Sequence, residues 1–403
     1  MLNMNTINWE WARSRILLDP HSTNLNCGSF GPTPIAVFEA CTKLRYELAS
    51  QPMDFFLRTS PSRLAKARTE LASYLGHDSK GLIFTTNVST AINLIANSWR
   101  FQPGDAILVT NHEYRAMRWA WERVAQRTGA RIITATIPHL ASDPQQIIDA
   151  IKPFLAPPVR LLFFSHVTSP TGLVLPASDL CSLARQRGIA TVVDGAHAVA
   201  TLNLDLTAIG ADCFGGNLHK WLGAPTGSGF LAFQSSFARY LEPLVVSWGY
   251  YLGDTDPDSD DIFGSTPHIR RLEFEGTRDP CPWLVVPDAI AFQKSLGPQA
   301  IQHRQRSLVT FTRETLQRFS WLVPATPHEE ALSGPMIAFQ VILPITLEQL
   351  RAFLWDHHRI EIGLNQHESL GLLMRISCHF FTTHEEIMQL AAALLDLENR
   401  GIA

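Results

Sequence analysis

The chain has 403 residues, of which 46% are hydrophobic and 17% are charged, and its formal net charge at pH 7 is -4. This is the composition of a globular protein with enough apolar side chains for a core. It has neither the surplus of Lys and Arg that is typical of nucleic-acid-binding proteins nor the polar bias of disordered chains, so we exclude both classes.

The sequence predicts neither a secretion signal nor a membrane span. Residues 1–15 are interrupted by polar side chains, and no stretch approaches the ~18 consecutive apolar residues that a membrane span needs. The six cysteines are scattered, without the Cys/His spacing of a zinc site. We therefore expect reduced thiols, no metal site, no membrane or nucleic-acid partner and a cytoplasmic location.

Short apolar runs alternate with helix-length segments through the first part of the chain. We expect strands at 81–86, 106–110, 131–136, 160–165 and 190–194, and helices at 89–98, 114–128, 144–155 and 176–188. This alternation predicts an α/β fold, in which a mostly parallel sheet is covered by helices on both faces.

After residue 243 the pattern changes. An Asp-rich loop (254–261) precedes expected helices at 288–295 and 301–319, a strand at 336–343, a helix at 347–356, a strand at 373–377 and a helix at 384–397. This order predicts a second, smaller α/β domain. We divide the chain into an N-terminal segment (1–24), a large domain (25–275) and a small C-terminal domain (276–403).

Polar residues gather where the predicted strands of the large domain end, which is where ligands bind in such sheets. Asp194 ends an apolar strand, and a carboxylate there favours a cationic partner. Residues 85–90 join a strand to a helix whose first amides can hold a phosphate. Ser165–Gly172 follows another strand, and Lys220 lies in a glycine-flanked turn. Each feature alone is typical of a helix cap or a surface residue, but together they indicate one site.

Two motifs, Asp194-Gly-Ala-His197 and Asn217-Leu-His-Lys220, resemble those of the class V aminotransferase group of fold type I pyridoxal-phosphate enzymes. Within that group, Asn26–Gly31, His112–Tyr114, Ser165–Gly172 and Glu275–Asp279 most resemble the isopenicillin N epimerase branch. The resemblance runs from residue 25 to residue 383. It implies the fold type I architecture, with a mostly parallel, seven-stranded type of sheet between helices in the large domain, and pyridoxal 5'-phosphate as cofactor.

The resemblance also implies a role for each matching residue. Lys220 is implied to bind the cofactor aldehyde as a Schiff base and to remove the α-proton of the substrate, and Asp194 to pair with the pyridine nitrogen. The other cofactor contacts are implied at the ring hydroxyl (His197, Ser169), at the phosphate (Val88, Ser89, Asn217, His219) and on the ring face (Tyr114).

Three further residues extend the implied site. Thr277 is implied to reach the cofactor phosphate of the neighbouring subunit, which predicts a homodimer with shared active sites. Arg375 is implied to bind the substrate α-carboxylate, because its planar fork fits that group. Asn26, in the N-terminal loop, is predicted to contact the substrate.

The chain departs from the pattern at Cys27, where epimerase-like sequences carry His, so the identity of a second acid or base is open. Cys27 itself is typical of a small buried apolar residue. Residues 359–371 form an expected loop without the cysteine that persulfide chemistry needs, which disfavours a cysteine desulfurase.

The leading hypothesis is an epimerase that acts at the α-carbon of an amino acid or amino-acid-derived substrate. An aminotransferase and a carbon-sulfur lyase stay open, because both begin with the same α-proton removal. A non-catalytic nucleotide-binding module is disfavoured, because the sequence has neither a G-x-G-x-x-G motif after a strand nor a P-loop motif.

Overall fold

The computed structural model describes residues 7–251 and 265–401, so the Asp-rich segment 254–261 lies outside the described residues. The larger of the two sheets described has the strand order β2-β8-β7-β6-β5-β3-β4. Its strands are β2 (Leu82–Thr85), β3 (Ala106–Thr110), β4 (Arg131–Ala135), β5 (Val159–Ser165), β6 (Ala190–Asp194), β7 (Cys213–Asn217) and β8 (Gly229–Phe233). Only β8 runs antiparallel to its neighbours in this sheet, which confirms the mostly parallel sheet.

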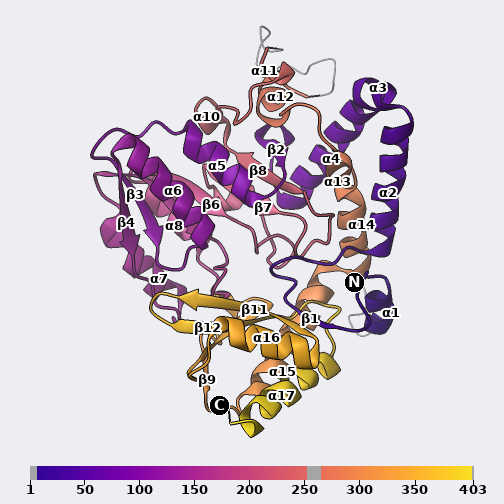
Figure 1. The fold of residues 1–403 in the computed structure, drawn as a ribbon. Helices are drawn as coiled ribbons and strands as arrows, with labels where there is room; N and C mark the ends of the chain where they lie inside the picture. Colours follow the sequence, from indigo (N-terminus) through magenta and orange to yellow (C-terminus); the bar gives the residue numbers. More distant parts are fainter. Residues whose placement is uncertain (1–6, 252–264, 402–403) are drawn as a thin grey trace.

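Helices cover both faces of the large sheet (Figure 1). Along β5, Leu161 and Phe163 belong to the core under α5 (Val88–Ser98) and α6 (Arg115–Thr128), whereas Leu162 and Phe164 belong to the core on the opposite face. Successive side chains of a strand point to opposite faces, so a strand between two helical layers is apolar throughout. The opposite face is covered by α2 (Ile35–Ser50), α4 (Ser60–Leu75), α7 (Pro144–Ile151), α8 (Ala177–Arg185) and α14 (Val286–Leu296).

Shorter helical segments connect these elements. They are α1 (Trp9–Ser14), α3 (Pro52–Asp54), α9 (Leu206–Ile209), α10 (Ser235–Ala238), α11 (Trp248–Tyr251), α12 (Pro267–Glu273) and α13 (Cys281–Leu284), with a π-helical turn at Phe55–Thr59 and 3-10 turns at Ser79–Gly81, Lys152–Phe154 and Glu330–Leu332. Within residues 7–251 and 265–401, no helix has both the length and the apolar character needed to cross a bilayer.

The small sheet has the order β1-β11-β12-β10-β9 and lies at one end of the molecule, with β1 in indigo and the other strands in orange in Figure 1. Its strands are β1 (Thr23–Leu25), β9 (Leu322–Pro324), β10 (Met336–Val341), β11 (Ile360–His367) and β12 (Gly371–Ser377), and its helices are α15 (Pro298–Leu316), α16 (Leu347–His358) and α17 (His384–Asn399). The expected loop at 359–371 is largely strand β11. Buried Ile360, Ile362 and Leu364 recur at every second position, which is the spacing of one face of a strand.

The proposed division at residues 24 and 275 stays a prediction. Two packing features bear on where a boundary can lie. Strand β1 pairs with β11 of the small sheet, although it precedes the whole large domain in sequence. Helices α13 and α14 follow residue 275 but pack against α2 and α4, because their apolar residues complete the core of the large domain.

Candidate active site

A cavity of about 370 Å³ opens where the strands of the large sheet end and the small domain begins. The loops that follow β3, β5, β6 and β7 contribute to its wall, together with the start of α5, the N-terminal loop and β12. Ten of the residues predicted from the sequence line it, namely Val88, Ser89, Tyr114, Ser169, Asp194, His197, Asn217, His219, Lys220 and Arg375. A pocket of this size is suited to a small organic ligand.

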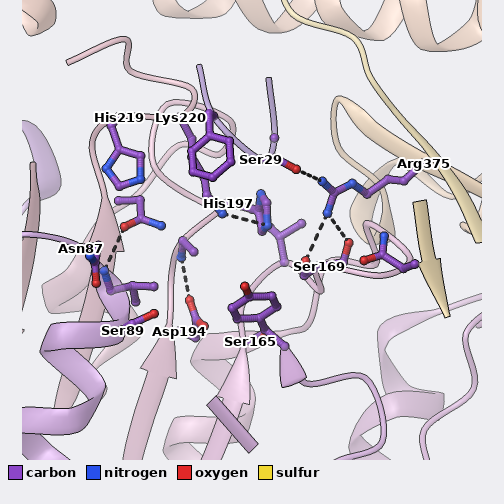
Figure 2. A pocket seen from close by; sticks show the side chains of 18 residues that line it. Ser29, Asn87, Ser89, Ser165, Ser169, Asp194, His197, His219, Lys220 and Arg375 are labelled. Atoms are coloured by element: carbon purple, nitrogen blue, oxygen red, sulfur yellow. Dashed lines mark hydrogen bonds between the residues drawn. The ribbon is translucent and has the colours of Figure 1, made fainter. Parts of the chain in front are cut away.

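Asp194 lies at the end of β6 and is only 3% exposed. One of its oxygens, Oδ1, accepts the Ala196 N–H at 2.9 Å (Figure 2). Among the described residues, its Oδ2 has no hydrogen-bond partner. Burial raises the pKa of Asp194, against the opposing effects of the Ala196 N–H and the Lys220 charge. A desolvated carboxylate on a cavity wall favours a cationic ligand atom, and this fits a protonated pyridine nitrogen.

Lys220 lies in the turn after β7, and the N-terminal loop packs directly against it. The Gly31 N–H donates to the His219 carbonyl at 3.0 Å, and any Cβ on Gly31 would collide with the Lys220 carbonyl, so only glycine fits there. Burial, followed by the nearby Arg375 charge, lowers the pKa of the Lys220 amine to about 7, although Asp194 opposes this shift. A substantial neutral fraction makes this amine a nucleophile near pH 7.

His197 contacts the Lys220 amine, with 3.3 Å between its Nε2 and Nζ (Figure 2). Burial and the charges of Lys220 and Arg375 hold the pKa of His197 well below its usual range, so the ring is neutral. Its Nδ1 accepts the Trp221 indole N–H at 3.5 Å, which assigns the ring proton to Nε2. The Nε2–H of the imidazole therefore points its proton toward Lys220 Nζ. A neutral amine can accept this proton in a hydrogen bond, because it has a free lone pair.

The start of α5 forms the end of the cavity that suits a phosphate. The Asn87 side chain caps the helix by accepting the Thr90 N–H at 2.9 Å, and Asn217 Oδ1 accepts the Val88 N–H at 2.9 Å. Within the part of the chain that the structure describes, the N–H and the hydroxyl of Ser89 have no hydrogen-bond partner. Free donors at the positive end of a helix dipole fit an anionic phosphate. Nearby, the His219 ring is oriented by a contact of 2.9 Å between Nδ1 and the Ser228 carbonyl.

Arg375, on β12, is 3% exposed and is held by neutral oxygens from two other segments. Its Nη1 donates to the Ser169 carbonyl and hydroxyl at 2.7 and 3.1 Å, and its Nη2 donates to Ser29 Oγ at 3.1 Å (Figure 2). Nη2 also donates to Asn26 Oδ1 at 3.2 Å. Burial lowers the pKa of Arg375 to about 10. In residues 7–251 and 265–401, no carboxylate forms a salt bridge with it, so this buried cation favours an anionic ligand.

The structure does not bring every predicted residue to the cavity wall. Asn26 stands behind Arg375 and links it to Glu361, to which it donates at 3.0 Å. Thr277 is exposed in the loop after α12 and does not line the cavity within one chain. Cys27 is fully buried, which agrees with its interpretation as an apolar residue.

The sequence did not identify eight lining residues as individual site positions, which are Gly28, Ser29, Phe30, Asn87, Ser165, Val167, Ala196 and Asn365. The helix-capping pattern before α5 is a signal that identifies Asn87. Asn365 carries no such signal, because only the register of β11 against β12 brings it to the cavity.

The sequence profile of the aminotransferase class-V family matches residues 32–390. The chain therefore belongs to this family and is a pyridoxal-phosphate-dependent enzyme. It is 48% identical to isopenicillin N epimerase from Streptomyces clavuligerus, over 97% of this chain and 98% of that protein. It is 46% identical to isopenicillin N epimerase from Amycolatopsis lactamdurans, over 96% and 98% of the two chains. A probable cysteine desulfurase from Xylella fastidiosa is 34% identical, over 81% and 78%.

Solved structures confirm the fold type I architecture. The cysteine desulfurase CsdA from Escherichia coli superimposes with a TM-score of 0.82 at 21% identity, over 98% of this chain and 99% of that chain. The cystine C-S lyase C-DES, in complex with cysteine persulfide, superimposes with a TM-score of 0.81 at 22% identity, over 94% and 98%.

Proposed function

We propose that this protein is an epimerase that inverts the α-carbon of an amino-acid substrate, with isopenicillin N as the first compound to test. The observation that carries the proposal is the arrangement around one cavity of a lysine whose amine pKa is lowered to about 7, a buried carboxylate, a helix N-terminus and a buried arginine held by neutral oxygens. The two isopenicillin N epimerases that resemble this chain over nearly its whole length support the same reaction.

Each group of cavity residues would bind a different part of the cofactor. Val88, Ser89, Asn217 and His219 would hold the phosphate, His197 and Ser169 the ring hydroxyl, Asp194 the pyridine nitrogen, and Tyr114 the ring face, while Lys220 would attach the aldehyde as a Schiff base. Pyridoxal phosphate, when bound, supplies an electron sink for the substrate α-carbon. Arg375 would orient the substrate through its α-carboxylate, and the Lys220 amine would remove the α-proton.

Persulfide chemistry lacks its nucleophile in this chain. All six cysteines are buried. Cys378, which follows β12, is fully buried, and burial raises the pKa of its thiol to about 11. A thiol in this state does not attack a substrate.

The reaction type is tested by incubating the holoenzyme with isopenicillin N in deuterated water. An epimerase incorporates deuterium at the α-carbon with inversion, which mass spectrometry and chiral chromatography detect. Release of a keto acid faster than α-deuteration would instead identify a lyase. Conversion of the cofactor to pyridoxamine phosphate would identify an aminotransferase.

Replacing Arg375 with alanine should raise KM and lower kcat/KM at least about 30-fold, because a charge-assisted bidentate contact contributes about 2 kcal/mol. Arg375→Lys should rescue only part of this loss, because an ammonium lacks the planar fork. Arg313→Ala is the matched control, since Arg313 is a half-buried arginine outside the cavity that also donates to carbonyls, those of Thr326 and Pro327 at 3.2 and 2.7 Å. Wild-type kinetics in Arg375→Ala would contradict the carboxylate-binding role.

We also propose a homodimer in which Thr277 contacts the cofactor phosphate of the partner subunit. The loop that carries Thr277 is tied to α2 by a salt bridge of 2.8 Å between Arg45 and Asp279. The same helix exposes Phe38 and Tyr46, and exposed apolar residues are typical of an interface. Sedimentation should show a dimer, and Thr277→Ala should weaken cofactor binding about tenfold, the scale of one hydrogen bond to a charged group. A monomer that retains bound cofactor would contradict the proposal.

A further inference from the structure

In an inversion at the α-carbon a proton leaves one face of the carbon and another arrives on the opposite face, and a second acid-base group on that face can deliver it. The titratable side chains on the cavity wall are Tyr114, Asp194, His197, His219, Lys220 and Arg375. Lys220 would serve one face. This inference rests on the proposed function and concerns the group that serves the other face.

The positions or contacts of four of these side chains disfavour them as the second acid-base group. His197 lies on the side of Lys220, at 3.3 Å from its amine. His219 is oriented by the Ser228 carbonyl and lines the cavity together with the start of α5. Asp194 is fixed at the end of β6, and Arg375 remains protonated, with a pKa of about 10. Tyr114 is the remaining group.

The order of the strands places the segment that carries Tyr114 and the segment that carries Lys220 on opposite sides of β6. Asp194 ends β6, and Lys220 follows β7, which is the neighbour of β6 on one side. On the other side come β5, which ends at Ser165, and then β3, which Tyr114 follows. A ligand held at Asp194 would therefore lie between the segments that carry Lys220 and Tyr114.

The segment before Tyr114 is fixed in place by Glu113. Its Oε1 accepts the Thr110 hydroxyl at 2.5 Å and its Oε2 accepts the Ser165 hydroxyl at 2.7 Å, which ties the start of α6 to the ends of β3 and β5. Tyr114 itself is 47% exposed, so water has access to this residue. The phenol also acts on the charge of Arg375, whose pKa it raises, so it lies within electrostatic reach of the guanidinium that would bind the α-carboxylate.

We propose that Tyr114 is the second acid-base residue of the epimerisation. In one direction the Lys220 amine takes the α-proton and becomes an ammonium, while the Tyr114 hydroxyl gives its proton to the opposite face of the α-carbon and becomes a phenolate. One C–H bond breaks and one forms, and no electrons are transferred to or from an outside reagent. The phenolate then takes a proton from water and the ammonium releases one. In the other direction the phenolate takes the proton and the ammonium delivers it.

The test uses Tyr114→Phe holoenzyme with isopenicillin N and, separately, with its α-epimer in deuterated water. Inversion should fall at least about 100-fold in both directions, the usual scale for losing a general acid or base. Exchange of the α-proton without inversion should persist from the epimer whose proton faces Lys220, and should be lost from the other. Affinity of the apoprotein for pyridoxal phosphate should be unchanged, because phenylalanine keeps the aromatic ring.

The matched control is Tyr240→Phe, which removes the hydroxyl of an exposed tyrosine outside this cavity that bonds to Arg239 at 2.8 Å. This variant should catalyse inversion of the α-carbon and exchange of the α-proton at the wild-type rates. Wild-type inversion in Tyr114→Phe would overturn the proposal. Equal loss of exchange from both epimers, or a matching loss of cofactor affinity, would also overturn it, since either result assigns Tyr114 to binding. A wild-type enzyme that inverts no substrate would instead refute the proposed function, and this role with it.

Discussion

Lys220→Ala is expected to abolish turnover, with a loss of at least about 10³-fold, because the variant lacks the amine that we propose attaches the cofactor and removes the α-proton. The fold should remain intact. The side chain belongs to a turn, and alanine keeps the backbone carbonyl that packs against Gly31. Removing a buried amine also removes the cost of its desolvation.

Three measurements check this prediction. Turnover is assayed with isopenicillin N, thermal unfolding of the apoproteins compares their stability, and borohydride treatment compares the absorption band of the bound cofactor. Lys66→Ala is the control, because the Lys66 side chain is 77% exposed and lies far from the cavity on α4. Wild-type activity in Lys220→Ala would refute the assignment, whereas loss of the folded state would show that Lys220 has a structural role.

Asp194→Asn should lower turnover at least about 100-fold while some cofactor binding survives. The amide has the shape of the carboxylate and its oxygen can still accept the Ala196 N–H. It carries no charge, however, so it does not keep the pyridine nitrogen protonated. Burial raises the pKa of Asp194 in the native state, so the apoprotein should lose no stability when a neutral group replaces a desolvated charge.

Asp212→Asn is the matched control for Asp194→Asn. Asp212 lies at the opposite end of the same pair of strands, where it accepts the Thr191 N–H and hydroxyl at 2.8 and 3.0 Å. This control should lower stability and leave turnover near that of the wild type. Equal turnover in Asp194→Asn and the wild type would mean that another group acts on the pyridine nitrogen.

The strands of the large sheet differ in how well the sequence predicts them. Strands β3 and β6 are continuous apolar runs, and both were predicted with the observed bounds. Strand β7 reads Cys-Phe-Gly-Gly-Asn, and its two glycines conceal it from any pattern of hydrophobicity. A side chain at Gly216 would meet the Phe230 ring, so packing between neighbouring strands explains that glycine. Strand β1 has only three residues, and its partner β11 lies near the other end of the chain.

The site was predictable where the chemistry is local. Asp194 and Lys220 were identified from short motifs that follow single strands, and Ser89 from the start of the helix after β2. The surroundings of Arg375 were not predictable, because its partners Asn26, Ser29 and Ser169 come from segments far apart in the sequence. The role of Thr277 stays a prediction, because the proposed contact is with the cofactor of a second subunit.

The sequence by itself determined the α/β class, the family and the residues available for chemistry, because each depends on short-range patterns of apolar and polar residues. The tertiary structure alone decided how those residues act. Burial at the cavity wall lowers the pKa of Lys220 to about 7. The order of strands around β6 separates Lys220 from Tyr114, and the docking of β12 against the N-terminal loop and the loop after β5 orients Arg375. These properties depend on strand order and on packing between the domains. Both result from many weak contacts between residues that are far apart in the sequence, so no local sequence pattern indicates them.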